Sequence, residues 1–243
     1  MIDESQLVPY RCSELPVTKG PWLVFAPHAD DESFGMGGTI TLAAATGIDV
    51  HVVIMTDGSL GGEQDNLVNI REQEARAASA LLGVSSVIFL KQKDRGLAVN
   101  PLLVNELVRL IEGSKPSAVF FPGIHEAHPD HRMTALLVWQ ALQKLGSDDV
   151  VPVGYEITGQ SPINCLVDIT TVIENKKQVI DVYQSQIGQK NYRDIVLALN
   201  RLRTFTLGKD VQWAEGFFVY EPIAIKGSLV EWAQQRLDRQ LAE

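Results

Sequence analysis

Short apolar runs that alternate with helical segments are the feature that most limits the fold of this 243-residue chain. The run WLVFAP at 22–27 is apolar on both faces and ends in proline, which is typical of a strand buried in a parallel sheet. An alanine-rich helix over about 36–45 and a second β-rich run, DVHVVIMT at 49–56, come next. This order predicts a βαβ unit. Gly35, Gly37 and Gly38 do not form GxGxxG, so they predict a tight turn before the first helix and no dinucleotide site.

The same alternation continues to the end of the chain. The pattern predicts further helices at 69–82, 101–112, 171–187, 191–203 and 229–241, and further strands at 87–90, 118–121, 150–157, 163–169 and 216–220. No Pro/Gly/Ser-rich linker interrupts the second half. We therefore expect one α/β domain over residues 1–243, with a doubly wound, mostly parallel sheet flanked by helices and an N-terminal extension at about 1–20.

Charge and cysteine content narrow the class of function. The chain has 21 basic and 30 acidic side chains, for a formal net charge of −9, which argues against nucleic acid as a partner. Cys12 and Cys165 are its two cysteines and form no CxxC pair, so they read as free thiols in a reducing compartment. The N-terminus lacks the features of a signal peptide, and no stretch is apolar and long enough to span a membrane. We expect a cytoplasmic protein. Nothing in the sequence excludes a homo-oligomer.

Polar residues follow three of the predicted strands. The segment HADDE comes after the first strand, TDG after the second, and GIHEAHPDH after the strand at 118–121. In a doubly wound sheet, ligands bind outside the carboxyl ends of the strands. These three loops are therefore expected to converge at one edge of the sheet.

Two of these segments carry the residue types of a metal site. They lie about 100 residues apart and contain His28, Asp30, Asp31 and Glu32 in the first, and His128, Asp130 and His131 in the second. Two histidines and a carboxylate, with a position left for water, are a common catalytic zinc set. Taken alone, either segment reads as a solvated acidic turn or a capped helix start. Together, after two apolar strands, they favour a metal centre.

The motifs resemble those of a known family. PHADDESFGMGG is similar to the AHPDDE signature, and HPDH matches the HxDH signature, of the PIG-L/LmbE-like N-acetylglucosaminyl deacetylases, which are zinc hydrolases with a Rossmann-like fold. TDGSLGGE, REQEARAASALLG, KDRGL, VDIT, YQSQ and EGFFVYEP follow in the family's order. Ala29 stands where the family usually has proline. The resemblance implies an enzyme that removes the N-acetyl group from an N-acetylglucosamine-type sugar or conjugate.

The resemblance also implies a metal set and a base. His28, Asp31 and His131 match the zinc ligands, although N/O donors of this kind also accept Fe2+ or Co2+. Asp30 matches the general base that takes a proton from the water on the metal. Glu32 is interpreted as ordering the turn or a ligand.

Four further positions receive roles from the same resemblance. His128 matches a protonated histidine that stabilises the oxyanion and donates a proton to the leaving amine, and Asp130 would keep that imidazole charged. Arg71 and Asp94 match residues that contact sugar hydroxyls. An arginine on a helix can also belong simply to a solvated face.

Two other functions stay open at this point. His28 and Asp30 with a distant histidine also spell the triad of Fe(II) oxygenases, although that triad usually lies on an all-β fold. A sugar- or nucleotide-binding module without catalysis is the second alternative. The presence of Asp30 and His128 argues against it. His51 and His125 are interpreted as ordinary structural or surface histidines.

Overall fold

The computed structural model describes residues 11–242, with side-chain surroundings defined as far as residue 235. Its strands are β1 (Arg11–Ser13), β2 (Trp22–Ala26), β3 (Val50–Thr56), β4 (Ser86–Gln92), β5 (Ala118–Pro122), β6 (Val151–Tyr155), β7 (Cys165–Asp168) and β8 (Ala214–Val219). Its α-helices are α1 (Asp31–Ala45), α2 (Leu67–Leu82), α3 (Pro101–Ser114), α4 (Pro129–Leu145), α5 (Ile173–Ile180), α6 (Gln184–Ile187), α7 (Tyr192–Leu202) and α8 (Leu229–Ala242). Short 3-10 helices span Thr170–Val172 and Pro222–Lys226.

The strands form one eight-stranded sheet in the order β1-β7-β8-β6-β5-β2-β3-β4. β8 runs antiparallel to both of its neighbours, and the other pairs are parallel. The predicted fold class, a mostly parallel sheet flanked by helices, is confirmed. The predicted extension at 1–20 has its described part in this sheet, because β1 pairs with β7 at the edge, while residues 1–10 lie outside the described residues.

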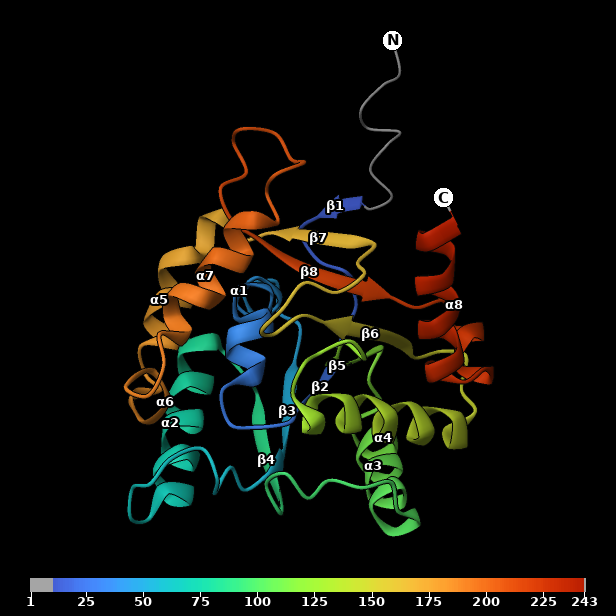
Figure 1. Cartoon of the computed structure of the whole chain (residues 1–243), viewed down its shortest axis with the longest axis horizontal. Helices are drawn as coiled ribbons and strands as arrows, with labels where there is room; N and C mark the ends of the chain where they lie inside the picture. Colours follow the sequence, from blue (N-terminus) through green and yellow to red (C-terminus); the bar gives the residue numbers. More distant parts are fainter. Residues whose placement is uncertain (1–10, 243) are drawn as a thin grey trace.

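Helices cover both faces of the sheet (Figure 1), and side chains that alternate along β2 join two separate core layers. Successive side chains of a strand point to opposite faces, so Trp22 and Val24 join the core under α1, α2, α5 and α7. Leu23 and Phe25 join the core under α3 and α4. All five residues of β2 are buried. This explains why the run reads as apolar without a period of two.

The connections place a crevice at the end of β2. From β2 the chain continues to β3 and β4 on one side, and then returns to β5 and β6 on the other. β2 and β5 are neighbours in the sheet, but the loops that leave their ends run in opposite directions. Such a position is a topological switch point, where open α/β sheets bind ligands. The segments HADDE and HPDH follow these two strands.

The expected start of the first helix is wrong by five residues. The helix begins at Asp31 rather than near Met36, and it contains the three glycines that predicted a preceding turn. A Cβ atom at Gly35 would lie 2.5 Å from the Tyr155 ring, and one at Gly38 would lie 2.7 Å from the Ile169 side chain. The glycines therefore let the helix backbone pack closely on the sheet, and the tight-turn interpretation is wrong.

The helix expected at 171–187 is interrupted. It divides into the 3-10 turn at Thr170–Val172, then α5, then α6. Tyr183, between α5 and α6, is fully buried, and its hydroxyl donates to Glu32 Oε1 at 2.8 Å. This contact draws the chain inward where a continuous helix would carry it past the sheet.

None of the helices among the described residues is both long and apolar enough to cross a bilayer. The cytoplasmic location stays a prediction.

Candidate functional site

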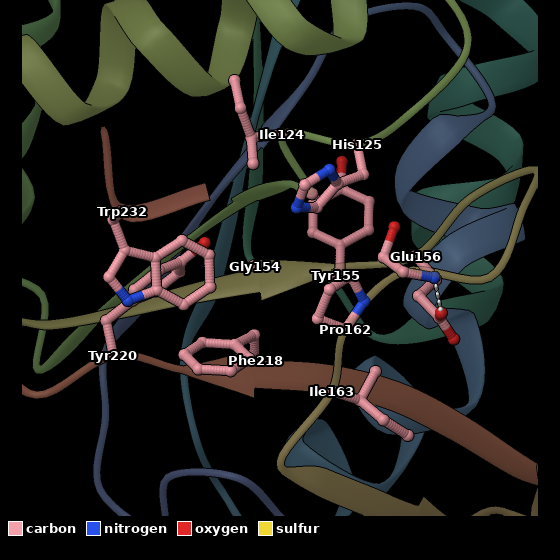
Figure 2. A pocket seen from close by; sticks show the side chains of 12 residues that line it. Ile124, His125, Gly154, Tyr155, Glu156, Pro162, Ile163, Phe218, Tyr220 and Trp232 are labelled. Carbon is pink, nitrogen blue, oxygen red and sulfur yellow. Dashed lines mark hydrogen bonds between the residues drawn. The ribbon is translucent and has the colours of Figure 1, made fainter. Parts of the chain in front are cut away.

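A small cavity lies between the loop after β5 and residues of strands β6 and β8 (Figure 2). Its volume of about 10 Å³ admits roughly one water molecule. His125 lines it, and burial lowers the pKa of this histidine. His51 instead exchanges a 2.8 Å hydrogen bond with Ser86 on the neighbouring strand. The structure thus places both histidines outside the cluster described next, in surroundings that fit their interpretation as ordinary histidines.

A much larger cavity of about 680 Å³ opens at the switch point. This volume falls within the range of small-molecule sites. The residues that line it come from the segments after β2, β3, β4, β5 and β6, from α2 and from the α6–α7 region: His28, Asp30, Asp31, Phe34, Leu60, Gly61, Arg71, Asp94, Arg95, Ala127, His128, Pro129, His131, Thr158, Gln186, Lys190, Tyr192 and Ile195. The loops that the sequence expected to converge do converge here.

The first polar segment folds back on itself directly after β2. Asp31 Oδ2 accepts the backbone N–H of His28 at 2.9 Å and lies 3.0 Å from His28 Nδ1. Both residues are more than nine-tenths buried. Because Asp31 opens α1, its carboxylate sits at the positive end of a helix.

The second polar segment begins α4. His128 is the N-cap and Pro129 occupies the first turn, where its missing N–H costs nothing. His131, one turn along, points its Nε2 to within 3.2 Å of Asp31 Oδ2. The rings of His28 and His128 are 4.7 Å apart, and those of His128 and His131 are 5.1 Å apart. The structure therefore gathers all three histidines around the Asp31 carboxylate.

In both His28 and His131, the ring nitrogen that does not face Asp31 lies near other carboxylates. His131 Nδ1 lies 3.4 Å from Glu126 Oε2. His28 Nε2 lies 3.3 Å from Asp130 Oδ2 and 3.4 Å from Asp94 Oδ1. Such outer carboxylates fix the orientation and tautomer of metal-binding histidines in known proteins.

These contacts shift the ionisation of the cluster. Burial alone would lower the pKa of His28, but the carboxylates of Asp130, Asp31 and Asp94 overcome it and raise that pKa well above its usual value. In the same way Asp31 outweighs burial and raises the pKa of His131 to about 9. The two imidazolium charges in turn hold the pKa of Asp31 below its usual range, against the effect of burial.

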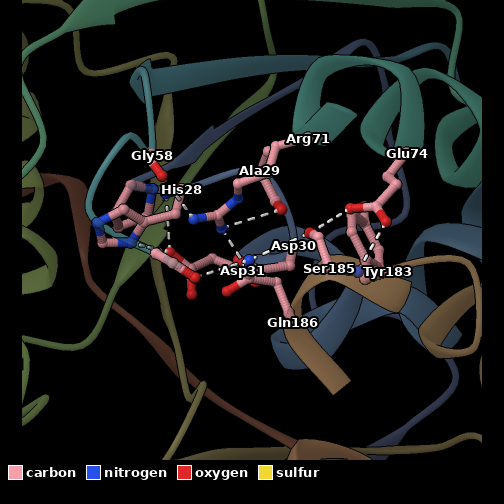
Figure 3. Close-up of polar contacts among 12 residues, drawn as sticks. His28, Ala29, Asp30, Asp31, Gly58, Arg71, Glu74, Tyr183, Ser185 and Gln186 are labelled. Carbon is pink, nitrogen blue, oxygen red and sulfur yellow. Dashed lines mark hydrogen bonds and ion pairs between the residues drawn. The ribbon is translucent and has the colours of Figure 1, made fainter. Parts of the chain in front are cut away.

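Asp30 has an arginine as its main partner (Figure 3). Arg71 Nη2 donates to Asp30 Oδ2 at 3.1 Å and to Ala29 O at 3.3 Å, and Nη1 donates to Gly58 O at 3.2 Å. A Cβ at Gly58 would lie 2.8 Å from the guanidinium, so the glycine there makes room for it. Burial, moderated by Arg71, raises the pKa of Asp30 to about 7.

Arg71 is buried at the wall of the large cavity, beside Asp30. It is 3% exposed, so the solvated-face alternative is wrong. It lines the large cavity, where contact with a sugar stays a prediction, and its hydrogen bonds go to Asp30 and to two backbone carbonyls. We read it first as the residue that orients Asp30.

Asp130 was expected to keep the His128 imidazole charged, but its carboxylate contacts other groups. Its carboxylate accepts the backbone N–H of Arg95 at 2.7 Å and faces His28. Burial, together with the charges of His28 and His131, lowers the pKa of His128. The Nδ1 atom of His128 accepts the backbone N–H of Asp130 at 3.2 Å. Since the other nitrogen of a neutral imidazole then carries the proton, Nε2 is the donor of His128.

Asp94 faces His28, whereas Glu32 bonds hydroxyl groups away from the histidines. Asp94 Oδ2 accepts the N–H of Leu60 at 2.9 Å, and its pKa falls to about 2 because the contact with His28 outweighs burial. Glu32 Oε1 accepts the hydroxyls of Ser33 and Tyr183, each at 2.8 Å. Glu32 thus fastens the first turn of α1 to the chain beyond α5.

The donor atoms fit a divalent metal. Asp31 Oδ2 lies 3.0 and 3.2 Å from its two histidine nitrogens, close to the roughly 3.3–3.4 Å expected between ligands of a tetrahedral zinc with bonds of about 2.0–2.1 Å. Among the described residues, His28, His128 and His131 also form a group of ligand atoms within 4.8 Å of one another, and so do His28, Asp94 and Asp130. His28 is common to all of these sets.

Sequence reasoning missed several residues of this site. Glu126 is 2% exposed and bonds Thr158 as well as His131, and its position inside GIHEAHPDH was a usable signal. Phe34 and Tyr192 line the cavity with ring centroids 5.9 Å apart. Tyr192 had no signal, because it lies on a helix far along the chain and only the fold brings it here.

Comparison with known proteins gives one family match. The model of the PIG-L family, described as GlcNAc-PI de-N-acetylase, matches residues 23–142. This range contains β3 to β5 and most of β2 and α4, and therefore both polar segments.

Individual relatives extend the likeness beyond that range. Diacetylchitobiose deacetylase of Thermococcus kodakarensis is 28% identical over 227 residues, which cover 82% of this chain and 84% of the relative. A probable N-acetyl-alpha-D-glucosaminyl L-malate deacetylase of Bacillus anthracis is 25% identical, covering 82% and 94%. The structure of N,N'-diacetylchitobiose deacetylase from Pyrococcus horikoshii superposes with a TM-score of 0.74 at 27% identity, covering 84% of each chain.

Proposed function

The chain belongs to the PIG-L family through residues 23–142, and on this premise we propose that it is a metal-dependent amide hydrolase, with zinc as the metal. Its substrate is an N-acetylglucosamine-type sugar or conjugate, from which it removes the N-acetyl group. The relatives named above are deacetylases of diacetylchitobiose and of a glucosaminyl malate, and these substrates share an N-acetylated glucosamine unit. The group attached to that unit differs between them, so the proposal covers the shared unit.

The observation that carries this proposal is the position of Asp31 Oδ2 between His28 Nδ1 and His131 Nε2 on the wall of the large cavity. We assign these three residues as the metal ligands. When bound, zinc would polarise the amide carbonyl and lower the pKa of a water. Fe2+ and Co2+ suit the same donors. Glu126 and Asp130 would hold the two imidazoles in the ligating orientation.

Asp30 would act as the general base. Its carboxylate is next to the ligand Asp31, lines the cavity, and has a pKa of about 7, close to the value that suits a base at neutral pH. Arg71 fixes the carboxylate through the 3.1 Å ion pair. Asp30 is therefore held at the cavity wall, where it would accept a proton from the attacking water.

His128 would stabilise the oxyanion. With Nδ1 engaged by the backbone of Asp130, the Nε2–H is the free donor, and the residue lines the cavity. This assigns a neutral hydrogen-bond donor in place of the imidazolium expected from the resemblance, because Nδ1 accepts a backbone N–H and leaves the proton on Nε2. Asp94 stays the proposed contact for a sugar hydroxyl.

The test is acetate release by purified protein from N-acetylglucosamine, N,N'-diacetylchitobiose and N-acetylglucosaminyl malate. Each substrate is assayed with protein as isolated, after chelation, and after zinc is restored. Release that chelation abolishes and zinc restores supports the proposal. Zinc bound at one per chain without release from any of these sugars would favour the binding-module alternative, and turnover that consumes oxygen would favour an Fe(II) oxygenase.

A further inference from the structure

The helix that carries Asp31 is not continuous. Met36 has φ −141° and ψ 22°, so α1 consists of a first turn at 31–35 and a body that begins after the kink. A kink of this size breaks the ladder of N–H to C=O hydrogen bonds and leaves backbone groups without helical partners. Buried groups of this kind need partners from elsewhere in the protein.

Two side chains from distant elements supply these partners. Glu215 of β8 accepts the N–H of Gly38 at 2.9 Å and the N–H of Thr39 at 2.8 Å. Lys176 of α5 donates to Phe34 O at 2.8 Å and to Glu215 Oε1 at 2.6 Å. The pair thus joins a carbonyl before the kink to two amides after it.

The pair is fully buried, since both side chains are 0% exposed. A buried ion pair is retained at a desolvation cost that good geometry and further hydrogen bonds must offset. Here the two carboxylate oxygens and the ammonium each have a backbone partner in α1 in addition to each other. Capping an ordinary helix end would need only a neutral side chain.

The turn that the pair holds faces the large cavity. Asp31 opens it, and Phe34, whose carbonyl Lys176 binds, lines the same cavity. Lys176 and Glu215 lie outside the family match at 23–142, in the second half of the chain.

We propose that Lys176 and Glu215 are positioning residues that set the angle between the first turn of α1 and its body, and so place the Asp30 and Asp31 carboxylates for metal binding and proton transfer. This inference rests on the proposed function of these two aspartates. Neither Lys176 nor Glu215 touches the substrate or the metal.

The test is the double variant Lys176→Met/Glu215→Gln, which removes both charges and leaves no buried charge unpaired. The matched control is Lys177→Met/Glu174→Gln, which removes the adjacent pair of the same helix, in which Glu174 is exposed and Lys177 is partly buried. We expect the first variant to bind zinc about 10–100-fold more weakly, as do changes in the support of metal ligands. We also expect its kcat to fall by up to about 10²-fold, as for a small misplacement of reacting groups, with KM near that of the parent protein.

Hydrogen exchange provides a readout that does not depend on activity. In the double variant the amides of Gly38 and Thr39 should exchange faster, while those in the body of α4 should keep their protection. The control variant should match the parent protein in zinc affinity, kcat and exchange. If the double variant fails to fold, Glu215→Asp, which keeps the charge of the pair but shortens its reach to the two amides, should show the same changes at smaller size.

A folded double variant with parent-like zinc affinity and parent-like exchange at 38–39 would overturn the proposal and leave the pair a purely stabilising one. If the parent protein binds zinc but releases no acetate from any sugar tested, the proposed function fails on its own, and the zinc affinity and exchange of the double variant still decide the positioning role.

Discussion

Two groups of buried charged side chains lie along α1, and they are built differently. Around its first residues, five carboxylates meet one guanidinium and two raised-pKa histidines: Asp30, Asp31, Asp94, Glu126 and Asp130, with Arg71, His28 and His131. At the kink, Lys176 meets Glu215, and each of the two also bonds the backbone of α1. The first group opens on a cavity of about 680 Å³, whereas the second has no exposed side-chain surface.

The two groups differ in whether the buried charges find all of their partners within the protein. Burying an ionised group is costly unless it is paired and hydrogen-bonded, and the kink pair meets that condition within the protein. The first group has more carboxylates than cations at a cavity wall, which supports the proposed binding of a divalent cation there. We therefore expect variants of the first group to act on metal binding and rate, and variants of the second to act on stability and on the geometry of α1.

The largest effect is expected from His131→Ala, because this removes a proposed metal ligand. Zinc per chain, measured by elemental analysis, should fall to background, and acetate release should be lost with it. His125→Ala, which changes a histidine of the same loop that lines the small cavity, should retain both. Full zinc occupancy in His131→Ala would move the metal toward the group formed by His28, Asp94 and Asp130.

Asp30→Asn should lower kcat by roughly 10²–10⁴-fold, the usual contribution of a positioned acid or base. Zinc content should be unchanged, since Asp30 is assigned as base and not as ligand. Asp65→Asn, an exposed site on the loop before α2, provides the control for the same chemical change. Parent-like turnover in Asp30→Asn would remove this carboxylate from the mechanism.

Lys176→Met should affect stability first, because it leaves Glu215 as a buried carboxylate without its cation. Breaking one side of a buried pair costs about 3–5 kcal/mol, which is a factor of roughly 10²–10³·⁵ in the folding equilibrium. The free energy of unfolding in urea provides the measurement. Adding Glu215→Gln to this variant should restore much of the loss, and a single variant as stable as the parent would mean that the pair contributes nothing.

Glu126→Gln is expected to have the smallest effect of the four. The amide keeps the shape of the side chain but holds His131 less strongly, so zinc affinity should fall by about 10–100-fold, the range for partners of metal-binding histidines. Competition with a chelator of known affinity measures the change. Glu112→Gln on the surface of α3 should leave the affinity as it is. An unchanged affinity in Glu126→Gln would separate this carboxylate from the metal site.

Much of the site was readable from the sequence because it lies in two short segments. The chain turns back within HADDE and begins α4 within HPDH, so local spacing alone places His28 beside Asp31 and His128 beside His131. The alternation of apolar runs then predicts that both segments leave the same edge of the sheet, since parallel strands end on one side. The ligand assignments themselves stay proposals.

Other features could not be read in this way. The start of α1 was misplaced because glycine has a poor helix propensity, and the close packing of α1 on Tyr155 and Ile169 overrides that propensity. The partner of Arg71 was missed because an arginine on an amphipathic helix looks the same whether its head group is in water or on Asp30.

The sequence by itself determined the fold class and the two polar segments, because strand and helix periods and turns depend on neighbours a few residues apart. Only the tertiary structure decided which carboxylate faces which histidine, that Arg71 holds Asp30, and that Lys176 and Glu215 fasten the kink of α1. Apart from the local pairs His28–Asp31 and His131–Glu126, those contacts join residues 39 to 177 positions apart. Their formation depends on which strands pair and how closely the helices pack, and no local pattern in the chain records that.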